Sequence, residues 1–228
     1  MRKTDIHIIL DYGHAKKTKG KSSPLYKTLS AKDQEFFAKH KEFGADRYYE
    51  YLSNRVIGRK IAEELRKHGW LVDEIVPENI TDVSLSERVR RTNTLCKRHG
   101  ASNCIFISIH SNASGSGKWM KAVGWSAYTT KGKTNSDKLA TCMYKFADKY
   151  FPKDGMKVRK DMSDGDPDWE ENFTVIKGAN CTAVLTESFF YDTLTDLKYL
   201  VSDKGQDAIV KTHVEGIEEY MRLYKGIQ

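Results

Sequence analysis

Short apolar runs alternate with amphipathic segments along this chain, and this order restricts the possible folds more than any other feature of the sequence. The apolar runs predict strands at 6–10, 70–76, 104–109, 124–130 and 182–186. Apolar residues at helical spacing predict helices over 51–68, 84–99, 134–150 and 203–224. Strands that alternate with helices favour a largely parallel sheet. We therefore predict an α/β fold with a mostly parallel, twisted sheet and helices on both faces.

The length and composition fit a single domain of this kind. A chain of 228 residues, of which 39% are hydrophobic, is long enough for one α/β domain with a substantial core. We expect one domain over residues 1–228, with long excursions over one rim of the sheet at 15–49 and 151–172. In α/β domains the loops at the carboxyl ends of the strands are where ligands usually bind.

The sequence shows neither a membrane span nor a signal peptide. No apolar run approaches the roughly 20 residues that a membrane helix needs. The apolar patch near the N-terminus is short and carries Asp5, His7 and Asp11, which a signal peptide would not contain. We expect synthesis in the cytoplasm without a signal peptide, so that any work outside the cell depends on release or a separate export route.

Charge and cysteine content do not by themselves select a partner. The net charge is +7, and the basic stretches "HAKKTKGK" and "RVRRTNTLCKRH" suit nucleic acid or any other anionic polymer. The second stretch lies on a predicted helix, where a solvated face is the favoured interpretation. The four cysteines are scattered and form no Cys-x-x-Cys pair, which indicates reduced thiols and no cysteine zinc cluster.

Chemically active side chains follow three of the predicted strands. His14 comes soon after strand 6–10, His110 follows strand 104–109 and Glu187 follows strand 182–186. Glu50 stands at the start of the helix predicted at 51–68. Because the carboxyl ends of parallel strands share one edge of a sheet, two imidazoles and a carboxylate can converge there.

Two histidines and one carboxylate form a ligand set of hydrolytic zinc sites, which keep a fourth position for water. Hydrolysis also needs a proton carrier that is not a ligand. The spacing alone leaves a second interpretation open, in which each histidine is a hydrogen-bonded structural residue, because no His-Glu-x-x-His motif is present.

Five segments in order resemble the motifs of the zinc-dependent N-acetylmuramoyl-L-alanine amidases of the amidase-3 family. The segments are "ILDYGHAKKTKGK", "EYLSNRVIGRKIAEELRKHGWLV", "SLSERVRRTN", "FISIHSNAS" and "AVLTESFF". Together with the remaining pattern they extend the resemblance from residue 6 to about residue 222. The order of the motifs makes this signal far more specific than a match to one of them.

The resemblance implies a role for each matching residue. His14, Glu50 and His110 would be ligands of Zn²⁺, and Glu187 would be the catalytic carboxylate. Asn112 would support the loop after His110 or face the substrate. The implied reaction is hydrolysis of the amide between N-acetylmuramic acid and L-alanine in peptidoglycan. Peptidoglycan is then the expected partner, with no nucleic acid, and the oligomeric state is unknown.

The resemblance is compatible with a phage-type or prophage-derived lytic enzyme and with a recycling amidase. We favour the lytic enzyme. No segment resembles a wall-binding repeat, so we expect no separate wall-binding domain. The sequence departs from the family pattern at Tyr12 and Ala15, beside the first histidine, and at Ser188 and Phe189, after the catalytic carboxylate.

Alternatives remain for several residues. Other carboxylates that suit a third ligand are Glu35, Glu42 and Asp46. Trp119, Trp125 and Trp169 offer surfaces for a sugar, although packing is favoured for Trp125. The acidic segment 163–171 lacks the spacing of a calcium-binding EF-hand. Cys181 is interpreted as a buried thiol, and His213 as a surface or helix-end histidine.

Two other functions compete with the amidase. A zinc peptidase or deacylase on a related scaffold would need a cation to hold a substrate carboxylate, for which Arg88 or Arg159 is available. A non-catalytic wall- or nucleic-acid-binding module would use the positive charge and would not need Glu187 near two histidines.

Overall fold

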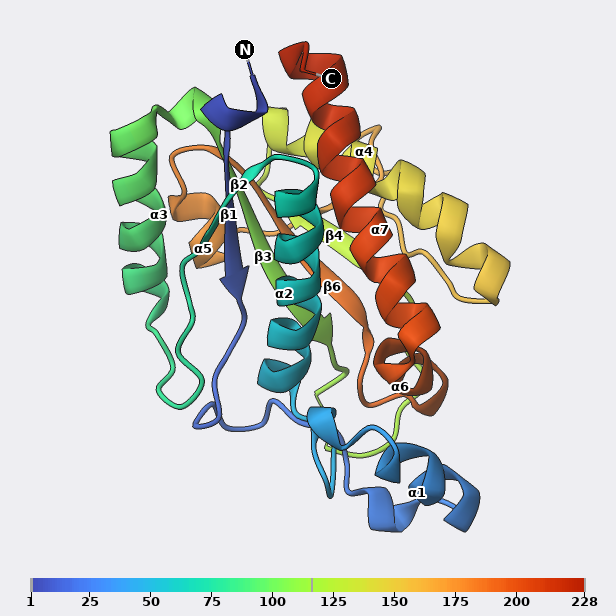
Figure 1. Cartoon of the computed structure of the whole chain (residues 1–228). Coiled ribbons are helices and arrows are strands. Elements are labelled where there is room, and N and C mark those ends of the chain that lie inside the picture. Colours follow the sequence, from blue (N-terminus) through green and yellow to red (C-terminus); the bar gives the residue numbers. More distant parts are fainter. Residues whose placement is uncertain (1, 116, 228) are drawn as a thin grey trace.

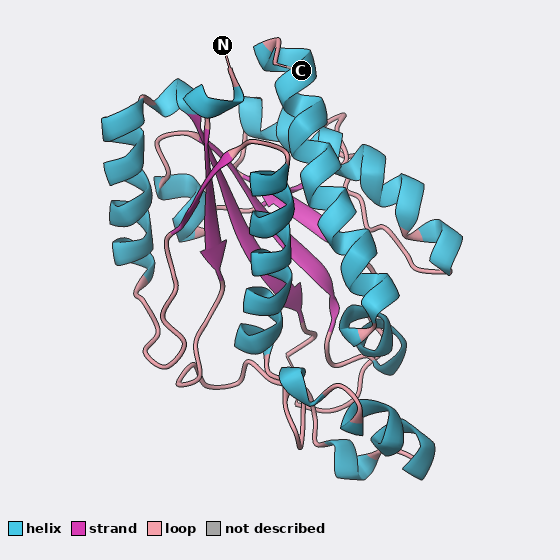
Figure 2. Ribbon diagram, viewed as in Figure 1, coloured by secondary structure: helices cyan, strands magenta, loops and turns pink. Residues whose placement is uncertain are grey.

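A computed structural model describes residues 2–115 and 117–227, and a six-stranded sheet forms the centre of the molecule (Figures 1 and 2). Met1, Ser116 and Gln228, which the predicted domain over 1–228 includes, lie outside the described residues. Across the sheet the order is β2 (Leu71–Glu74), β1 (His7–Tyr12), β3 (Cys104–Asn112), β6 (Thr182–Phe190), β4 (Ser126–Thr129) and β5 (Trp169–Glu170).

The sheet is mostly parallel, as predicted. Strands β2, β1, β3 and β6 run in the same direction, and β4 is antiparallel to β6. From β1 the chain moves to β2 on one side and then returns to β3 on the other. The crevice at the carboxyl ends of β1 and β3 is therefore a topological switch point, the place where open α/β sheets usually bind ligands.

Helices cover both faces of the sheet, which also confirms the prediction. Helix α2 (Glu50–Lys67) lies beside α7 (Asp203–Tyr220) on one face, with α4 (Asn135–Tyr150) and α6 (Leu194–Val201) next to α7 (Figure 1). Helix α3 (Leu85–His99) and the short α5 (Thr174–Gly178) lie on the other face.

The period of two along each strand divides the core between the two faces. Ile8 and Leu10 of β1 belong to the larger core, under α2 and α7, while Ile9 between them belongs to the smaller core under α3. The same alternation occurs in β3, where Ile107 and Phe106 lie in different cores. Both faces of these strands are buried, which explains why their sequences are almost continuously apolar.

Several element boundaries differ from those predicted. Strands β3 and β6 continue beyond residues 109 and 186, to Asn112 and Phe190, while the strand predicted at 124–130 is limited to Ser126–Thr129. The helix predicted to end at 224 is α-helical to Tyr220 and continues as a π turn over Met221–Lys225.

The two predicted excursions have different positions. Residues 15–49 contain α1 (Ala31–Ala38), which lies beyond the end of the sheet toward which β1 points (Figure 1). Residues 151–172 instead follow the outer edge of the sheet, since Val158 bridges to Trp125 and Trp169–Glu170 pairs with β4 as β5. Among the described helices, none has the length and apolar character needed to cross a membrane.

Candidate metal centre and catalytic cavities

The structure brings His14, Glu50 and His110 together at the carboxyl ends of β1 and β3. One ligand atom from each residue lies within 4.8 Å of the others, and this is the only such group of three among the described residues. His14 Nε2 lies 3.4 Å from Glu50 Oε2, and His110 Nδ1 lies 3.1 Å from Glu50 Oε1. The three residues predicted as ligands from the sequence are therefore the three that converge.

The backbone before His14 is shaped by its contact with His110. A Cβ atom on Gly13 would lie 2.2 Å from Cε1 of the His110 ring, so no larger residue fits there without displacing that ring. Gly13 also donates its N–H to the carbonyl of Ile109, which joins the end of β1 to β3. His14 itself has φ +61°, a left-handed conformation that non-glycine residues rarely adopt. Such strain is typical of functional sites.

Glu50 begins α2 and is almost completely buried, with 1% of its surface exposed. Its Oε1 accepts hydrogen bonds from the Ser111 N–H at 3.3 Å and from Asn54 Nδ2 at 3.4 Å. Asn54 also donates to the carbonyl of Gly13, so it connects the two segments that carry His14 and Glu50. Oε2 of Glu50 has no hydrogen-bond donor and remains available to a cation.

Burial and mutual contact determine the protonation of the group. Burial lowers the pKa of His14 to about 4, although the Glu50 carboxylate acts in the opposite direction. Burial alone would raise the pKa of Glu50, but the hydrogen bond from His110 and the charge of the histidines hold it below its ordinary value. The same hydrogen bond raises the pKa of His110 against the effect of burial. A bound cation would take the place of a proton in this group.

Glu187 lies directly beside the group, because Glu187 of β6 is the register partner of His110 in β3. Its Oε2 is buried and has no hydrogen-bond donor. Burial raises the pKa of the carboxyl group to about 7, with opposing contributions from His110 and Lys21. A carboxyl group with a pKa near neutrality is able both to accept and to donate a proton at working pH.

Neither His110 nor Glu187 is the last residue of its strand, which differs from the predicted strand ends. The register between β3 and β6 shifts between His110 and Asn112, and Phe189 has φ +64°. This irregularity turns the two strands just beyond the candidate site, in the way that bulges often redirect side chains near active sites.

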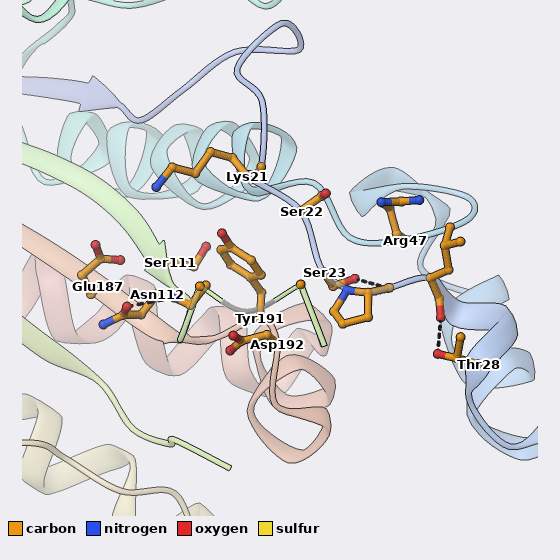
Figure 3. A pocket seen from close by; sticks show the side chains of 16 residues that line it. Lys21, Ser22, Ser23, Thr28, Arg47, Ser111, Asn112, Glu187, Tyr191 and Asp192 are labelled. Atoms are coloured by element: carbon orange, nitrogen blue, oxygen red, sulfur yellow. Dashed lines mark hydrogen bonds between the residues drawn. The ribbon is translucent and has the colours of Figure 1, made fainter. Parts of the chain in front are cut away.

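Two cavities meet at the candidate metal centre. The first, of about 700 Å³, lies between residues 20–25 and residues 111–113, and Asn112 and Tyr191 contribute to its wall (Figure 3). The second, of about 590 Å³, is lined by His14 and His110 and by residues of 83–85 and 173–175, which are mostly apolar. Glu187 lines both cavities, so a ligand that extends from one to the other passes this carboxylate.

The alternative carboxylates lie elsewhere. Glu35 is exposed and pairs with Lys39, Asp46 lies 3.5 Å from Arg47, and Glu42 lies 3.8 Å from His40. None of the three belongs to the group of converging ligand atoms among the described residues.

Neither Arg88 nor Arg159 is placed to bind a substrate carboxylate at the candidate metal centre. Arg88 is buried and donates to Asp11 at 2.6 Å and to Asp82 at 2.9 Å, so its guanidinium is committed to the protein. Arg159 lies over the rings of Trp169 and Phe190 and lines neither of the two cavities described above.

Other interpretations from the sequence have mixed outcomes. Trp125 is fully buried in the core, as favoured, while the indole of Trp119 donates to Thr28. Cys181 is a free thiol, only partly buried. The surface interpretation of His213 is wrong, because its side chain is completely buried between α7 and β6.

The sequence pattern of one family matches residues 8–219, and this family is described as N-acetylmuramoyl-L-alanine amidase. The match covers most of the chain and contains all four candidate residues of the site. This chain therefore belongs to the N-acetylmuramoyl-L-alanine amidase family designated amidase 3.

Individual relatives agree with this assignment. An endolysin of Bacillus phage SPP1 is 27% identical over 143 residues, which are 62% of this chain and 46% of the phage protein. The matched region thus spans about half the length of that endolysin.

Solved structures of amidases share the fold. An N-acetylmuramoyl-L-alanine amidase from Clostridium difficile 630 superimposes with a TM-score of 0.72 at 22% identity, covering 96% of this chain and 98% of the other. The catalytic domain of an endolysin targeting Clostridia difficile gives a TM-score of 0.60 at 21% identity, covering 94% and 97%.

Proposed function

We propose that this protein hydrolyses the amide bond between N-acetylmuramic acid and L-alanine in peptidoglycan, with Zn²⁺ held by His14, Glu50 and His110. The observation that carries the proposal is the convergence of these three ligand atoms beside the buried carboxylate of Glu187, in a chain that belongs to this amidase family. The proposed catalytic unit is the single domain that contains the sheet.

The three residues suit zinc in their chemistry. They offer two imidazole nitrogens and a carboxylate oxygen, and Glu50 Oε2 is buried without a donor. The lowered pKa of His14 keeps its imidazole neutral near pH 7, as a ligand must be. When bound, zinc would supply Lewis-acid activation of a water molecule and of the substrate carbonyl.

Glu187 would transfer the proton that amide hydrolysis requires. The attacking water must lose a proton, and the departing amine of L-alanine must gain one. A single carboxylate beside both atoms performs the two transfers in sequence, first as base and then as acid. The raised pKa of Glu187 and its fixed position in β6 support this assignment. Asn112, in the wall of the first cavity, would contact the substrate there.

A lytic role of the phage type is the setting that we propose. The support is the similarity to an endolysin of Bacillus phage SPP1 over 143 residues. In this role the protein would act on the cell wall after release from the cytoplasm, with peptidoglycan as its macromolecular partner.

Digestion of purified peptidoglycan tests the proposal. The metal-loaded protein should release N-terminal L-alanine, a chelator should abolish the release, and added Zn²⁺ should restore it. His14→Ala and His110→Ala should each lose bound zinc and activity together. Full activity in a metal-free preparation would exclude the zinc assignment, and release of amino termini other than L-alanine would indicate a peptidase.

A further inference from the structure

Among the residues that the structure describes, two line both cavities at the candidate centre, Glu187 and Lys21. A substrate cleaved here has an acyl half and an amine half that lie on opposite sides of the bond. If each cavity holds one half, the bond lies at the junction of the cavities. Glu187 and Lys21 are then the two side chains beside it.

Lys21 is held in place by the same segment that carries a candidate ligand. The N–H of Glu50 donates to the carbonyl of Lys21 at 3.1 Å, and Ser22 forms an antiparallel bridge with Tyr49. Figure 3 shows the Lys21 side chain extended from this segment, with its ammonium on the side of the cavity where Glu187 lies. Its backbone is therefore fixed relative to the start of α2.

The ammonium of Lys21 is available to a substrate. No carboxylate within residues 2–115 and 117–227 forms an ion pair with it, in contrast to Arg88 of the second cavity, which is bound to Asp11 and Asp82. Its positive charge acts on the nearby carboxylates, since it is one of the groups that oppose the effect of burial on the pKa of Glu187.

We propose that Lys21 is a further catalytic residue, whose ammonium donates a hydrogen bond to the carbonyl oxygen of the scissile amide. The inference rests on the amidase function proposed above. As water adds to the carbonyl carbon, the π electrons of the C=O bond pass to this oxygen and Glu187 accepts the proton of the water. Lys21 stabilises the resulting negative charge and keeps its own proton. Glu187 then delivers its proton to the amine as the C–N bond breaks.

In the substrate complex, Lys21 should stabilise the negative charge on the carbonyl oxygen more strongly than its exposed position in the free protein suggests. A substrate that fills both cavities displaces water from around the ammonium, and charges interact more strongly where water is excluded. Because the negative charge develops only during the reaction, the interaction should raise the rate constant kcat and leave substrate binding almost unchanged.

The test compares Lys21→Met with Lys19→Met in the zinc-loaded protein. Both substitutions remove one positive charge from the same loop, but Lys19 is exposed and lines neither cavity. With a soluble muropeptide, Lys21→Met should lower kcat by about 10²–10³-fold, the usual effect of removing one such donor. KM and the zinc content should stay near parental values, and Lys19→Met should behave as the parent. Lys21→Arg, which retains a cation, should recover part of the rate.

Several results would overturn the inference. They are equal kcat values for Lys21→Met and Lys19→Met, a raised KM with unchanged kcat, and loss of zinc or of the fold in both Lys21 variants. A rate that recovers fully at the variant's own pH optimum would instead assign the effect to the protonation of Glu187, and would also refute a direct contact. If the parental protein itself releases no L-alanine amino terminus, the amidase proposal fails, which is a different outcome.

Discussion

Replacing Glu187 with glutamine removes the proposed proton carrier while the size of the side chain is kept. We expect Glu187→Gln to fold, to bind zinc and to bind muropeptide, because Glu187 is not among the three converging candidate ligands. The hydrolysis rate should fall by about 10²–10⁴-fold, the usual contribution of a positioned acid–base group. Hydrolysis rates and zinc stoichiometry, measured on one preparation, distinguish a proton carrier from a zinc ligand at this position. Parental activity in a zinc-loaded variant would refute the role, and loss of zinc would make Glu187 a ligand.

Gly13 is where the packing of the candidate centre is tightest. In Gly13→Ala the new methyl group would meet the His110 ring at 2.2 Å, so the ring must leave the position in which it contacts Glu50 at 3.1 Å. We expect weaker zinc binding, measured by competition with a chromophoric chelator. Gly132→Ala is the control, because its Cβ meets nothing within 4 Å and only its positive φ is strained. Equal zinc affinity in the two variants would show that Gly13 does not position His110.

For single residues, the sequence predicts the candidate ligands better than the residues that hold them in place. His14, His110 and Glu187 follow apolar strands that can be recognised locally, and the family resemblance identifies Glu50. The contacts of Asn54 and Ser111 with Glu50 depend on how α2 packs against β1 and β3, for which the sequence carries no local signal. The place of Lys21 between two cavities likewise follows from the whole fold.

Helix α7 carries a buried histidine that should make stability depend on pH. Nδ1 of His213 donates to the carbonyl of Ile209 at 2.8 Å, so Nε2 accepts the hydroxyl of Thr186 at 2.9 Å in the neutral ring. Burial lowers the pKa of His213 from 6.5 to about 4. The unfolded chain then binds this proton at higher pH than the folded protein does. The stabilisation is fully present above about pH 6.5 and is lost as the pH falls toward about 4.

The expected size of this effect follows from the pKa difference. Between about pH 7.5 and pH 5, His213 should account for a loss of about 2 kcal/mol in the free energy of unfolding. His213→Gln, which does not titrate, should lose less stability by that amount over the same interval, measured by urea unfolding. The carboxylates and the candidate centre titrate in both proteins, so their contributions to the pH dependence of stability cancel in the comparison. Parallel stability curves for the two proteins would contradict the assignment.

The elements that the sequence predicts well are those with a long, regular pattern. The helices α2, α3, α4 and α7 each contain at least 15 residues, and the sequence pattern predicts boundaries close to the observed ones. The elements missed are α1, α5, α6 and β5, which have between two and eight residues. Such short segments show too few periods of a pattern, and their structure depends on packing against the sheet. The burial of His213 has a different cause, because it depends on how the well-predicted helix α7 packs against β6, where Thr186 contacts the ring.

The excess of positive charge is a property of the whole molecule and should affect encounter with the wall more than chemistry. The chain carries a net charge of +7. Cell walls bear anionic polymers, toward which exposed lysines and arginines would steer the protein. At about 0.15 M salt the screening length is about 8 Å and it shortens as salt is added, so this steering should weaken progressively.

Two substrates distinguish the effect of charge on association with the wall from its effect on the rate of hydrolysis. We expect hydrolysis of intact cell walls to slow steadily with added salt, because association with an anionic polymer is screened. Hydrolysis of a small soluble muropeptide should change much less, since it samples only the charges near the cavities. Initial rates for both substrates in one salt series provide the measurement, with zinc content checked at the highest salt as a control. The same salt dependence for both substrates would show that the net charge does not direct the protein to the wall.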